Sequence, residues 1–509
     1  MNSTIDCDLL VVGGGLNGTA IARDAAGRGL SVVLCERDDL GAHAAVSACG
    51  PLHQPLSSLH RQALASLRKA LAERETLMRI APHAVTPLRL AVPRDSGQQP
   101  WRERASRMLA NRLAPRQLLP ASRQVDLLHH AAGLPLKPQF SEGELVSGCE
   151  VDGPRLAVLN AMDAAEAGAT ILTRTVCDAA QRSGEHWQAT LRGAGGAGTL
   201  VRARAMVNAT GQWATRFLRS ASNIDLPLPL VKCIRLRVRK KLAHPCSYLL
   251  RGDNGRSVLV LPCEPDATLI IGDGLPHGGG PGAPEVSAEE IERLCSLVNR
   301  YFTARTSATD VMQASAGLRL AVATGDATAQ AMPQPHALRL DRDGAPLLTV
   351  LGGDPESFRR VAEEAVDQLA SLLGESGGAW TSQACLPGGD LFGMSPTAQS
   401  VLGFGDYLRR KKQAFGWAPA ALVERWVHAY GSRIDRLLSG CTGMDDLGPE
   451  ILPGLFAAEV TYLVRHEWAQ TAEDILWRRS RLGLRLSPDA GDVLARWLAA
   501  APAPQAMHA

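Results

Sequence analysis

A glycine-rich turn lies between the first apolar run of this chain and its first helical segment. Residues 8–36 contain a short apolar run, three consecutive glycines, an alanine-rich segment and a second β-rich run, the pattern of a βαβ unit. Gly13, Gly15 and Gly18 have the spacing G-x-G-x-x-G. In such a unit the first glycine permits a tight turn, the second admits a pyrophosphate, and the third lets helix and strand pack closely. We therefore predict a Rossmann-type dinucleotide site, in preference to a glycine turn without a ligand.

Two further features bear on which dinucleotide this site binds. Glu36 ends the second β-rich run, where an acid accepts hydrogen bonds from the adenosine ribose. The glycines alone do not separate NAD from FAD. However, residues 207–211 read V-N-A-T-G, an apolar strand that runs into a turn of small residues. Such a turn returns the chain to the cofactor in two-dinucleotide flavoproteins, although an ordinary strand-to-turn junction is the alternative, and FAD is our prediction.

Charge and cysteine content exclude several other classes of protein. The net charge of +3, from 54 Lys and Arg against 51 Asp and Glu, gives no reason to propose a nucleic-acid partner. The eleven cysteines include no C-x-x-C pair, so we expect no metal site. Their odd number and the lack of a signal peptide indicate reduced thiols in the cytoplasm. No apolar run approaches the roughly 20 residues that span a bilayer.

The length of 509 residues predicts two or more domains. Residues 1–380 are expected to form the oxidoreductase region, with FAD-binding segments at about 1–95, 150–225 and 340–375 and substrate-domain segments between them. After a break at 387–389 the chain becomes helical, which predicts a C-terminal helical domain over 385–509. The expected fold class is α/β: a Rossmann-type FAD-binding domain, an inserted mixed-sheet substrate domain and a C-terminal all-helical cap.

Beyond the glycine turn, the chain resembles a known family. Residues 8–34, D-L-L-V-V-G-G-G-L-N-G-T-A-I-A-R-D-A-A-G-R-G-L-S-V-V-L, resemble the aerobic, FAD-dependent glycerol-3-phosphate dehydrogenases. The likeness continues through A-L-A-E-R-E at 70–75, A-P-H at 81–83, V-N-A-T-G-Q-W at 207–213, A-W-T at 379–381, L-P-G-G at 386–389, Y-L-V-R-H-E-W at 462–468 and A-E-D-I-L-W-R-R at 472–479. The likeness covers nearly the whole chain, and the C-terminal run is more specific to the family than the glycines.

This resemblance implies an activity and a set of site residues. The family oxidises sn-glycerol 3-phosphate to dihydroxyacetone phosphate in glycerol and glycerophospholipid metabolism; hydride passes to FAD and the electrons then go to a membrane quinone. Such a reaction needs a cation site for the phosphate and a base for the C2 hydroxyl. The implied FAD contacts are Gly13, Gly14, Gly15, Leu16, Asn17, Gly18, Glu36, Arg37, Val176, Ala209, Thr210, Gly211 and Gly353. The candidate catalytic residues are Arg319 and His53.

The substrate half of the site departs from the family pattern. In the loop that reads S-S-K-L-I-H-G-G-L-R-Y in the family, His53 matches the histidine, while Gly50, Ser57 and Ser58 replace the lysine, arginine and tyrosine. Further along, the family's G-G-K-L-T-T-Y-R becomes G-G-D-P-E-S-F-R at 352–359, and K-G-S-H becomes K-C-I-R at 232–235. Losing two cations around a phosphate weakens substrate binding by ~1.5–3 kcal/mol for each charged hydrogen bond.

One cation of the family pattern remains in this half of the site. Arg319, in A-G-L-R, matches the arginine of the family's S-G-V-R-P-L, and its guanidinium fork suits a phosphate dianion. A salt-bridged surface arginine is the alternative. Three functions therefore stay open: a dehydrogenase of this family, a catalytically weak or inactive FAD-binding paralogue, and an FAD oxidoreductase for a different substrate. The resemblance over the whole chain favours the first, with glycerol 3-phosphate as substrate and quinone as acceptor.

Residues 101–116 bear on where the protein lies in the cell. They contain five arginines interleaved with Trp101, Met108, Leu109 and Leu113. A basic amphipathic helix with this pattern could lie on anionic lipid, and a solvated surface helix is the alternative. We expect a cytoplasmic protein, either free or peripheral on the inner face of the membrane.

Overall fold

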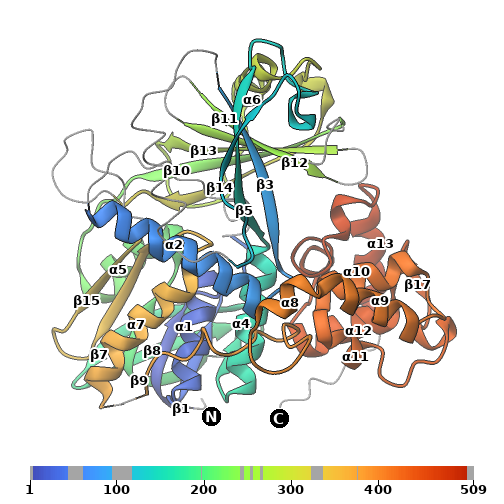
Figure 1. Cartoon of the computed structure of the whole chain (residues 1–509). Coiled ribbons are helices and arrows are strands. Elements are labelled where there is room, and N and C mark those ends of the chain that lie inside the picture. Colours follow the sequence, from blue (N-terminus) through green and yellow to red (C-terminus); the bar gives the residue numbers. More distant parts are fainter. Residues whose placement is uncertain are drawn as a thin grey trace.

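The computed structural model describes residues 4–43, 61–94, 117–196, 198–240, 246–252, 256–263, 267–322, 336–374 and 377–500, and only the backbone of 61–67 and of Asp273. The expected α/β class is confirmed: two eight-stranded sheets lie one above the other, and a mainly helical C-terminal region packs beside the lower sheet (Figure 1).

The first sheet is built on the βαβ unit that the glycine spacing predicts. Strand β1 (Thr4–Val12) runs parallel to β2 (Val32–Cys35) on one side and to β9 (Gly198–Asn208) on the other. The sheet is extended by β6 (Thr170–Leu172), β16 (Leu347–Gly352) and β15 (His336–Asp341), in the order β15-β16-β9-β1-β2-β6. Only β15 pairs antiparallel along this path.

Both faces of this sheet are covered, as a parallel sheet requires. Helix α1 (Leu16–Gly27) lies between α4 (Gly153–Glu166) and α7 (Phe358–Leu373) on one face. On the other face, β7 (Thr175–Ser183) and β8 (His186–Gly193) form an antiparallel layer with β9. Successive side chains of β1 point to opposite faces of the sheet. Leu9 and Val11 pack against the helices, whereas Leu10 and Val12 pack in the cluster that contains Trp187.

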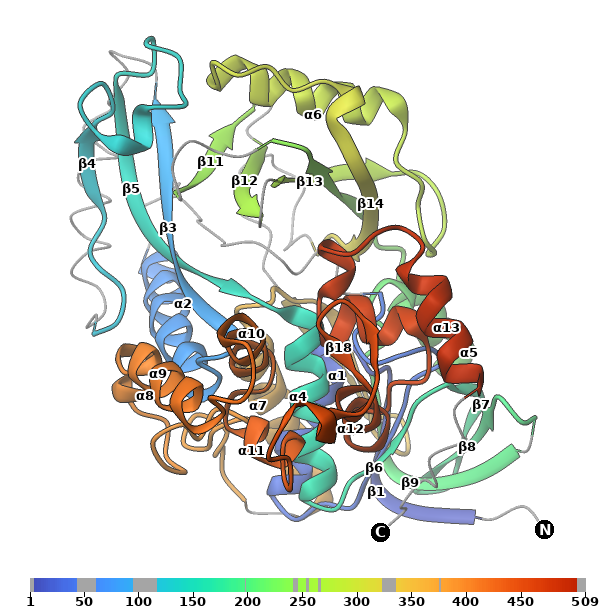
Figure 2. The same ribbon diagram turned by 90° about the vertical axis from the view of Figure 1, so that its right-hand side faces the viewer.

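The second sheet is assembled from segments that interrupt the first. Its order is β14-β10-β13-β12-β11-β3-β5-β4. The strands are β3 (Val85–Arg94), β4 (Arg123–Asp126), β5 (Glu142–Val151), β10 (Leu230–Val238), β11 (Ser247–Arg251), β12 (Ser257–Cys263), β13 (Ala267–His277) and β14 (Val311–Leu320). Helix α6 (Ala288–Tyr301) covers one face through Leu294 and Val298 (Figures 1 and 2). The expected insertion of a mixed sheet is thus confirmed.

The C-terminal region forms its own core around Trp426 and Tyr430. Its helices are α8 (Ala398–Leu402), α9 (Phe404–Ala414), α10 (Ala420–Tyr430), α11 (Ile434–Leu437), α12 (Ala457–Glu467) and α13 (Ala490–Ala500). The region is not purely helical, since β17 (Glu450–Leu452) pairs with β18 (Leu455–Phe456). Within this predicted helical region, η6 (Asp474–Arg479) is a π-helical turn.

Helix α4 is where the C-terminal region meets the first sheet, and both α12 and η6 contact it (Figure 2). The C-terminal region also contacts the N-terminal part of the chain, because α8 lies against α2 (Arg61–Ile80). Among the described residues, no helix combines the length and the apolar character needed to cross a membrane.

Candidate functional site

The glycine turn has the shape that a pyrophosphate requires. Gly13 has a φ of +111°, and a Cβ built on it would lie 2.5 Å from the carbonyl oxygen of Ala209. A Cβ on Gly18 would lie 1.9 Å from the Gly13 oxygen, so helix α1 approaches the turn more closely than any side chain allows. Gly15 differs, because no described atom lies within 4 Å of its Cβ position. The turn is therefore packed from behind and open in front of Gly15.

The open side of the turn faces the beginning of helix α1. Gly15 is the residue that precedes the helix, and it offers no side chain to cap the first N–H groups. Unsatisfied N–H groups at a helix N-terminus attract anions, and the helix dipole adds to this attraction. The predicted contacts Gly13, Gly14, Gly15, Leu16, Asn17 and Gly18 thus form one continuous cradle that fits a dinucleotide pyrophosphate.

Glu36 lies beside this cradle, as the spacing predicts. Its carboxylate accepts one hydrogen bond of 2.6 Å from the Gly14 amide and another of 2.9 Å from the Asp38 amide. Burial raises the pKa of Glu36 above its ordinary value, while the two backbone hydrogen bonds oppose that shift. The two amides fix the carboxylate at the end of β2, where it can accept hydrogen bonds from ribose hydroxyls.

Residues from three segments meet beside Glu36. The Thr175 amide donates a 2.7 Å hydrogen bond to the Glu36 carbonyl, which brings the start of β7 and the partly exposed Val176 next to the acid. The Arg37 guanidinium lies 3.8 Å from the ring centroid of Trp213. Trp213 is not among the residues that the sequence predicts for the site, although Trp213 is the last residue of the V-N-A-T-G-Q-W run at 207–213.

A buried asparagine, Asn208, fixes the turn of small residues at 209–211, which the sequence assigns to the cofactor site. The Asn208 side chain accepts hydrogen bonds from the Thr210 hydroxyl (2.7 Å) and amide (3.3 Å), and it donates one of 2.8 Å to the Ala214 carbonyl. The Ala209 amide in turn donates to Val12 at the end of β1. Ala209, Thr210 and Gly211 are therefore held against the glycine turn, and the asparagine of V-N-A-T-G was the available signal for this role.

Gly353 also meets the cradle, from the end of β16. The Asn17 side-chain amide donates a 3.2 Å hydrogen bond to the Gly352 carbonyl. Gly353 has a φ of +109°, and a Cβ there would lie 2.8 Å from the Asn17 nitrogen. A residue with a side chain would be strained at this φ and would displace the Asn17 side chain, so glycine suits the position where the third segment meets the turn.

The substrate half is described in part. His53, with Gly50, Ser57 and Ser58, lies outside the described residues. Arg319 is half-buried on β14 and pairs with Val231 of β10. Its neighbours Leu318 and Leu320 pack with Ala214 and Leu351. This end of β14 therefore lies against two segments: the one that follows the Asn208 turn, and the end of β16.

Asp354, which stands where the family has a lysine, follows Gly353 directly. Its amide and carbonyl hydrogen-bond to Ser357 just before helix α7. Two residues on, the Glu356 carboxylate accepts a 2.6 Å hydrogen bond from Arg74 of α2. The segment 352–359, which departs from the family pattern, is therefore joined to α2 by an ion pair.

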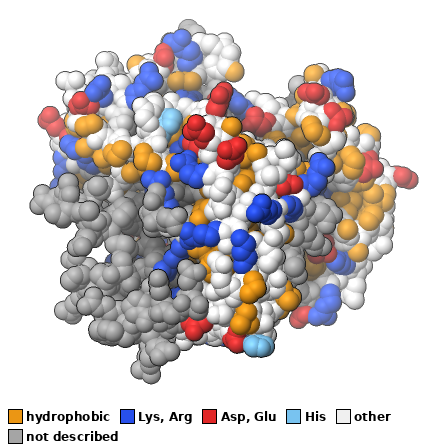
Figure 3. Space-filling view, turned by 90° about the horizontal axis from the view of Figure 1, so that it is seen from above, with side chains coloured by type: hydrophobic (Ala, Val, Ile, Leu, Met, Phe, Trp, Pro, Cys, Tyr) orange, Lys and Arg blue, Asp and Glu red, His pale blue; other side chains and the backbone are white. Residues whose placement is uncertain are grey.

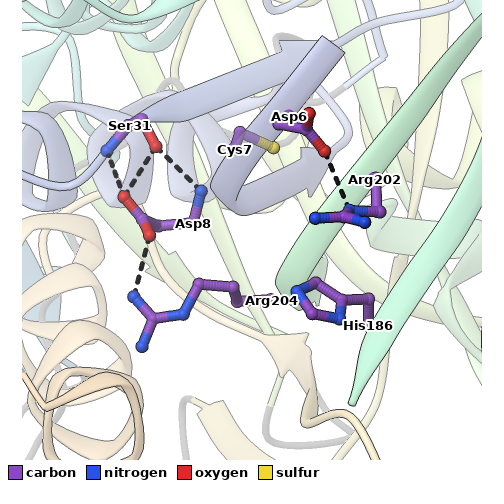
Figure 4. Close-up of a pocket in the computed structure, with 7 residues that line it drawn as sticks. All are labelled: Asp6, Cys7, Asp8, Ser31, His186, Arg202 and Arg204. Atoms are coloured by element: carbon purple, nitrogen blue, oxygen red, sulfur yellow. Dashed lines mark hydrogen bonds and ion pairs between the residues drawn. The ribbon is translucent and has the colours of Figure 1, made fainter. Parts of the chain in front are cut away.

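A shallow cavity of about 200 Å³ lies at the opposite end of β1 from the glycine turn (Figure 4). It is lined by Asp6, Cys7, Asp8, Ser31, His186, Arg202 and Arg204. Its charges pair with one another: Asp6 with Arg202 at 2.9 Å, and Asp8 with Arg204 at 2.8 Å. Because of its position and its internal pairing, this cavity takes no part in the cofactor site.

Known protein families match the two parts of the chain separately. Residues 8–353 match the FAD dependent oxidoreductase family, and residues 379–501 match the C-terminal domain of alpha-glycerophosphate oxidase. A glycerol-3-phosphate dehydrogenase of Pseudomonas aeruginosa is 39% identical, over 94% of this chain and 93% of its own. The aerobic glycerol-3-phosphate dehydrogenase of Escherichia coli is 32% identical (96% and 97%), and the D-erythritol 1-phosphate dehydrogenase of Brucella abortus is 36% identical (96% and 97%).

Solved structures share the fold. The glycerol-3-phosphate dehydrogenase of Bacillus halodurans, complexed with FAD, superimposes with a TM-score of 0.74 at 22% identity, covering 97% of this chain and 90% of its own. An FAD-bound L-alpha-glycerophosphate oxidase of Mycoplasma pneumoniae gives a TM-score of 0.59 at 15% identity, with coverage of 75% and 99%.

Proposed function

Because this chain belongs to the FAD-dependent glycerol-3-phosphate dehydrogenase family, we propose that it oxidises sn-glycerol 3-phosphate to dihydroxyacetone phosphate and passes the electrons to a quinone. The chain is an FAD-dependent oxidoreductase, and FAD is its cofactor. The observation that carries the proposal is the complete FAD cradle from Gly13 to Glu36 in a chain that matches named dehydrogenases over 94% of its length.

The residues of the site divide the work of this reaction. The turn at Gly15 binds the pyrophosphate, and Glu36 accepts hydrogen bonds from the ribose. Val176 and Trp213, which lie near Glu36, would be the candidates for contact with the adenine of FAD. FAD, when bound, supplies the acceptor for the hydride that leaves C2 of the substrate. Arg319 holds the phosphate through two parallel hydrogen bonds, and His53 takes the proton of the C2 hydroxyl. Seen from above, Lys and Arg side chains gather near the middle of the molecule, with Asp and Glu side chains beside them (Figure 3).

The three parts of the chain have separate tasks in this proposal. Residues 1–380 form the oxidoreductase region, with the first sheet holding FAD and the second sheet holding the substrate. Residues 385–509 form the C-terminal domain, and the separate core around Trp426 supports this division. Transfer to quinone also requires the protein to reach the membrane surface from the cytoplasm. Residues 101–116 are our candidate for that contact, and they lie outside the described residues.

Anaerobic stopped-flow spectroscopy tests this function. Mixing the yellow protein with sn-glycerol 3-phosphate should bleach the flavin rapidly and saturably, and a soluble quinone should restore the colour. A longer polyol phosphate, such as erythritol phosphate, is the matched control because it shares the phosphate and differs in chain length. Faster bleaching by the longer substrate, or none by either, would contradict the proposal.

A further inference from the structure

The C-terminal region reaches the adenosine end of the FAD site through one buried residue, Asp39. The Asp39 carboxylate is 1% exposed and lies in the loop that follows β2 and Glu36. It accepts hydrogen bonds from two consecutive arginines of η6: from the Arg478 Nε, and from both Nη atoms of Arg479, each at 2.8 Å. Both arginine side chains are buried as well. A fork of this kind fixes the position and the orientation of a carboxylate.

The loop held in this way is part of the cofactor cradle. At its start, the Glu36 carboxylate accepts the hydrogen bond from the Gly14 amide. At its end, the Gly41 amide donates a 3.0 Å hydrogen bond to the Gly14 carbonyl. Between them, a Cβ on Gly14 would lie 2.9 Å from the Leu40 side chain. Displacement of Asp39 would therefore move Glu36 relative to the glycine turn.

The same π-helical turn, η6, also binds the loop that precedes Val176. Asp474, at the beginning of η6, accepts hydrogen bonds of 2.7 and 2.9 Å from Arg174, which lies in the turn just before Val176. Arg174 has a φ of +54°, and its amide donates a 3.0 Å hydrogen bond to the Asp38 carbonyl. The Arg174 backbone thus joins the two loops, and its side chain ties both to the C-terminal region.

The ion pairs of Asp39 and Asp474 continue into the helices on either side, α12 and α4. Asp474 also pairs with Arg478 within η6, and Arg479 donates to the Glu467 carbonyl at the end of α12. The Glu467 carboxylate is bound by both Nη atoms of Arg155 on α4. Each buried charge has an opposite charge beside it, which such burial demands. The arrangement is therefore a rigid connection between the two regions and not a set of isolated surface pairs.

From this geometry we propose that η6 is a clamp on FAD: Arg478, Arg479 and Asp474 position the loops that carry Glu36 and Val176, and so set how tightly FAD is held. They are positioning residues, since they act through Asp39 and Arg174. The clamp goes beyond the proposed function, because it concerns retention of the cofactor and holds for any substrate.

Two variants test the clamp without leaving an isolated buried charge. In Arg478→Gln, Asp39 keeps Arg479 and Asp474 keeps Arg174. In Arg174→Gln, the substituted side chain is 28% exposed in the wild type, and Asp474 keeps Arg478. The matched control is Arg433→Gln, because Arg433 joins the same two regions through Glu166, at 2.7 Å. Glu166 lies at the far end of α4 from Arg155, roughly 16 Å along the helix axis.

The readout is binding of FAD to the full-length apoprotein, followed by quenching of flavin fluorescence, together with the melting temperature of the apoprotein. We expect each test variant to raise the dissociation constant of FAD about tenfold and to speed FAD release. The control should change it less than about twofold, and the melting temperatures show how much general stability each variant has lost. Asp39→Asn combined with Arg478→Gln should be no worse than Asp39→Asn alone.

Two results would overturn the clamp. One is that Arg478→Gln and Arg174→Gln both bind FAD within about twofold of the wild type. The other is that the control weakens FAD binding as much as they do, since the C-terminal region would then contribute only general stability. Because FAD binding is measured without substrate, neither result bears on whether glycerol 3-phosphate is oxidised.

Discussion

The carboxylate of Glu73, on helix α2, accepts two hydrogen bonds of 2.6 Å from the guanidinium of Arg359, on helix α7. Both side chains are buried. Arg359 also binds Thr381, which belongs to the A-W-T run that resembles the family. The segments 70–75 and 379–381, which carry part of the resemblance, therefore share one polar cluster with Arg359, and this cluster joins α2 to α7.

Glu73→Gln should destabilise the protein substantially. The substitution keeps the shape of the side chain but removes one of the two carboxylates that pair with Arg359, which keeps its ion pair with Glu363. Losing one charged partner of a buried group costs about 1–3 kcal/mol of unfolding free energy. Urea denaturation of the apoprotein measures the loss. The control is Asp225→Asn, which breaks the exposed pair with Arg219 and should change the free energy by less than ~1 kcal/mol.

Gly15→Val should leave a folded protein that binds no FAD. Since no described atom lies within 4 Å of the Gly15 Cβ position, the described residues leave room for the new side chain, which occupies the place of the pyrophosphate. The purified variant should be colourless, with an apoprotein melting temperature close to that of the wild-type apoprotein. An unchanged flavin spectrum would refute the assignment of the cradle.

The cofactor cradle could be predicted from the sequence because its determinants are local. Gly13, Gly15, Gly18 and Glu36 lie within one βαβ unit, and each is required by the backbone or by the ligand at a fixed spacing. The Asn208 turn was recognisable for the same reason. Local chemistry therefore carried the prediction of the FAD half.

The contacts between distant segments could not be predicted. Arg479 and Asp39 are far apart in the chain, and no local pattern tells an arginine which of many acids it will meet. The prediction of a helical C-terminal domain likewise gave no sign of the π-helical turn that brings Arg478 and Arg479 onto the same carboxylate. Such partners depend on the packing of α12 and η6 against α4, which only the folded chain specifies.

His83 should make the protein less stable in mild acid. Its ring is buried beside Gly388 and Gly431, and neither ring nitrogen has a hydrogen-bond partner among the described residues. Burial lowers the pKa of His83 to about 3, and the nearby Arg155 and His428 add to this shift. The unfolded chain binds the proton near pH 6.5. Protonation therefore favours unfolding, and stability should fall as the pH drops from 6.5 towards 3.

The size of this effect can be isolated with a variant. Between pH 6.5 and pH 5, His83 should account for a loss of about 2 kcal/mol in unfolding free energy. His83→Gln should remove this part of the pH dependence, whereas replacing the exposed His129 should change it much less. Identical slopes in the wild type and in His83→Gln, measured by urea denaturation at each pH, would show that the ring is not the group that titrates.

Arg319→Ala should remove recognition of the substrate phosphate while FAD stays bound. Two charged hydrogen bonds of ~1.5–3 kcal/mol each are lost, so kcat/KM for glycerol 3-phosphate should fall at least about a hundredfold. The variant keeps the apolar contacts of β14, which packs through Leu318 and Leu320. Arg123→Ala is the control, since Arg123 is exposed on β4 at the opposite edge of the same sheet.

The specificity of the Arg319 variant separates phosphate binding from general damage to the site. The wild type should prefer glycerol 3-phosphate strongly over glycerol, because only the phosphate uses the guanidinium fork. Arg319→Ala should lose this preference, so that both substrates reduce the flavin at similarly low rates in anaerobic stopped-flow. If the variant instead keeps the preference, or bleaches as fast as the wild type, the phosphate is held by other residues of the substrate half, where Gly50, Ser57 and Asp354 stand in place of the family's cations.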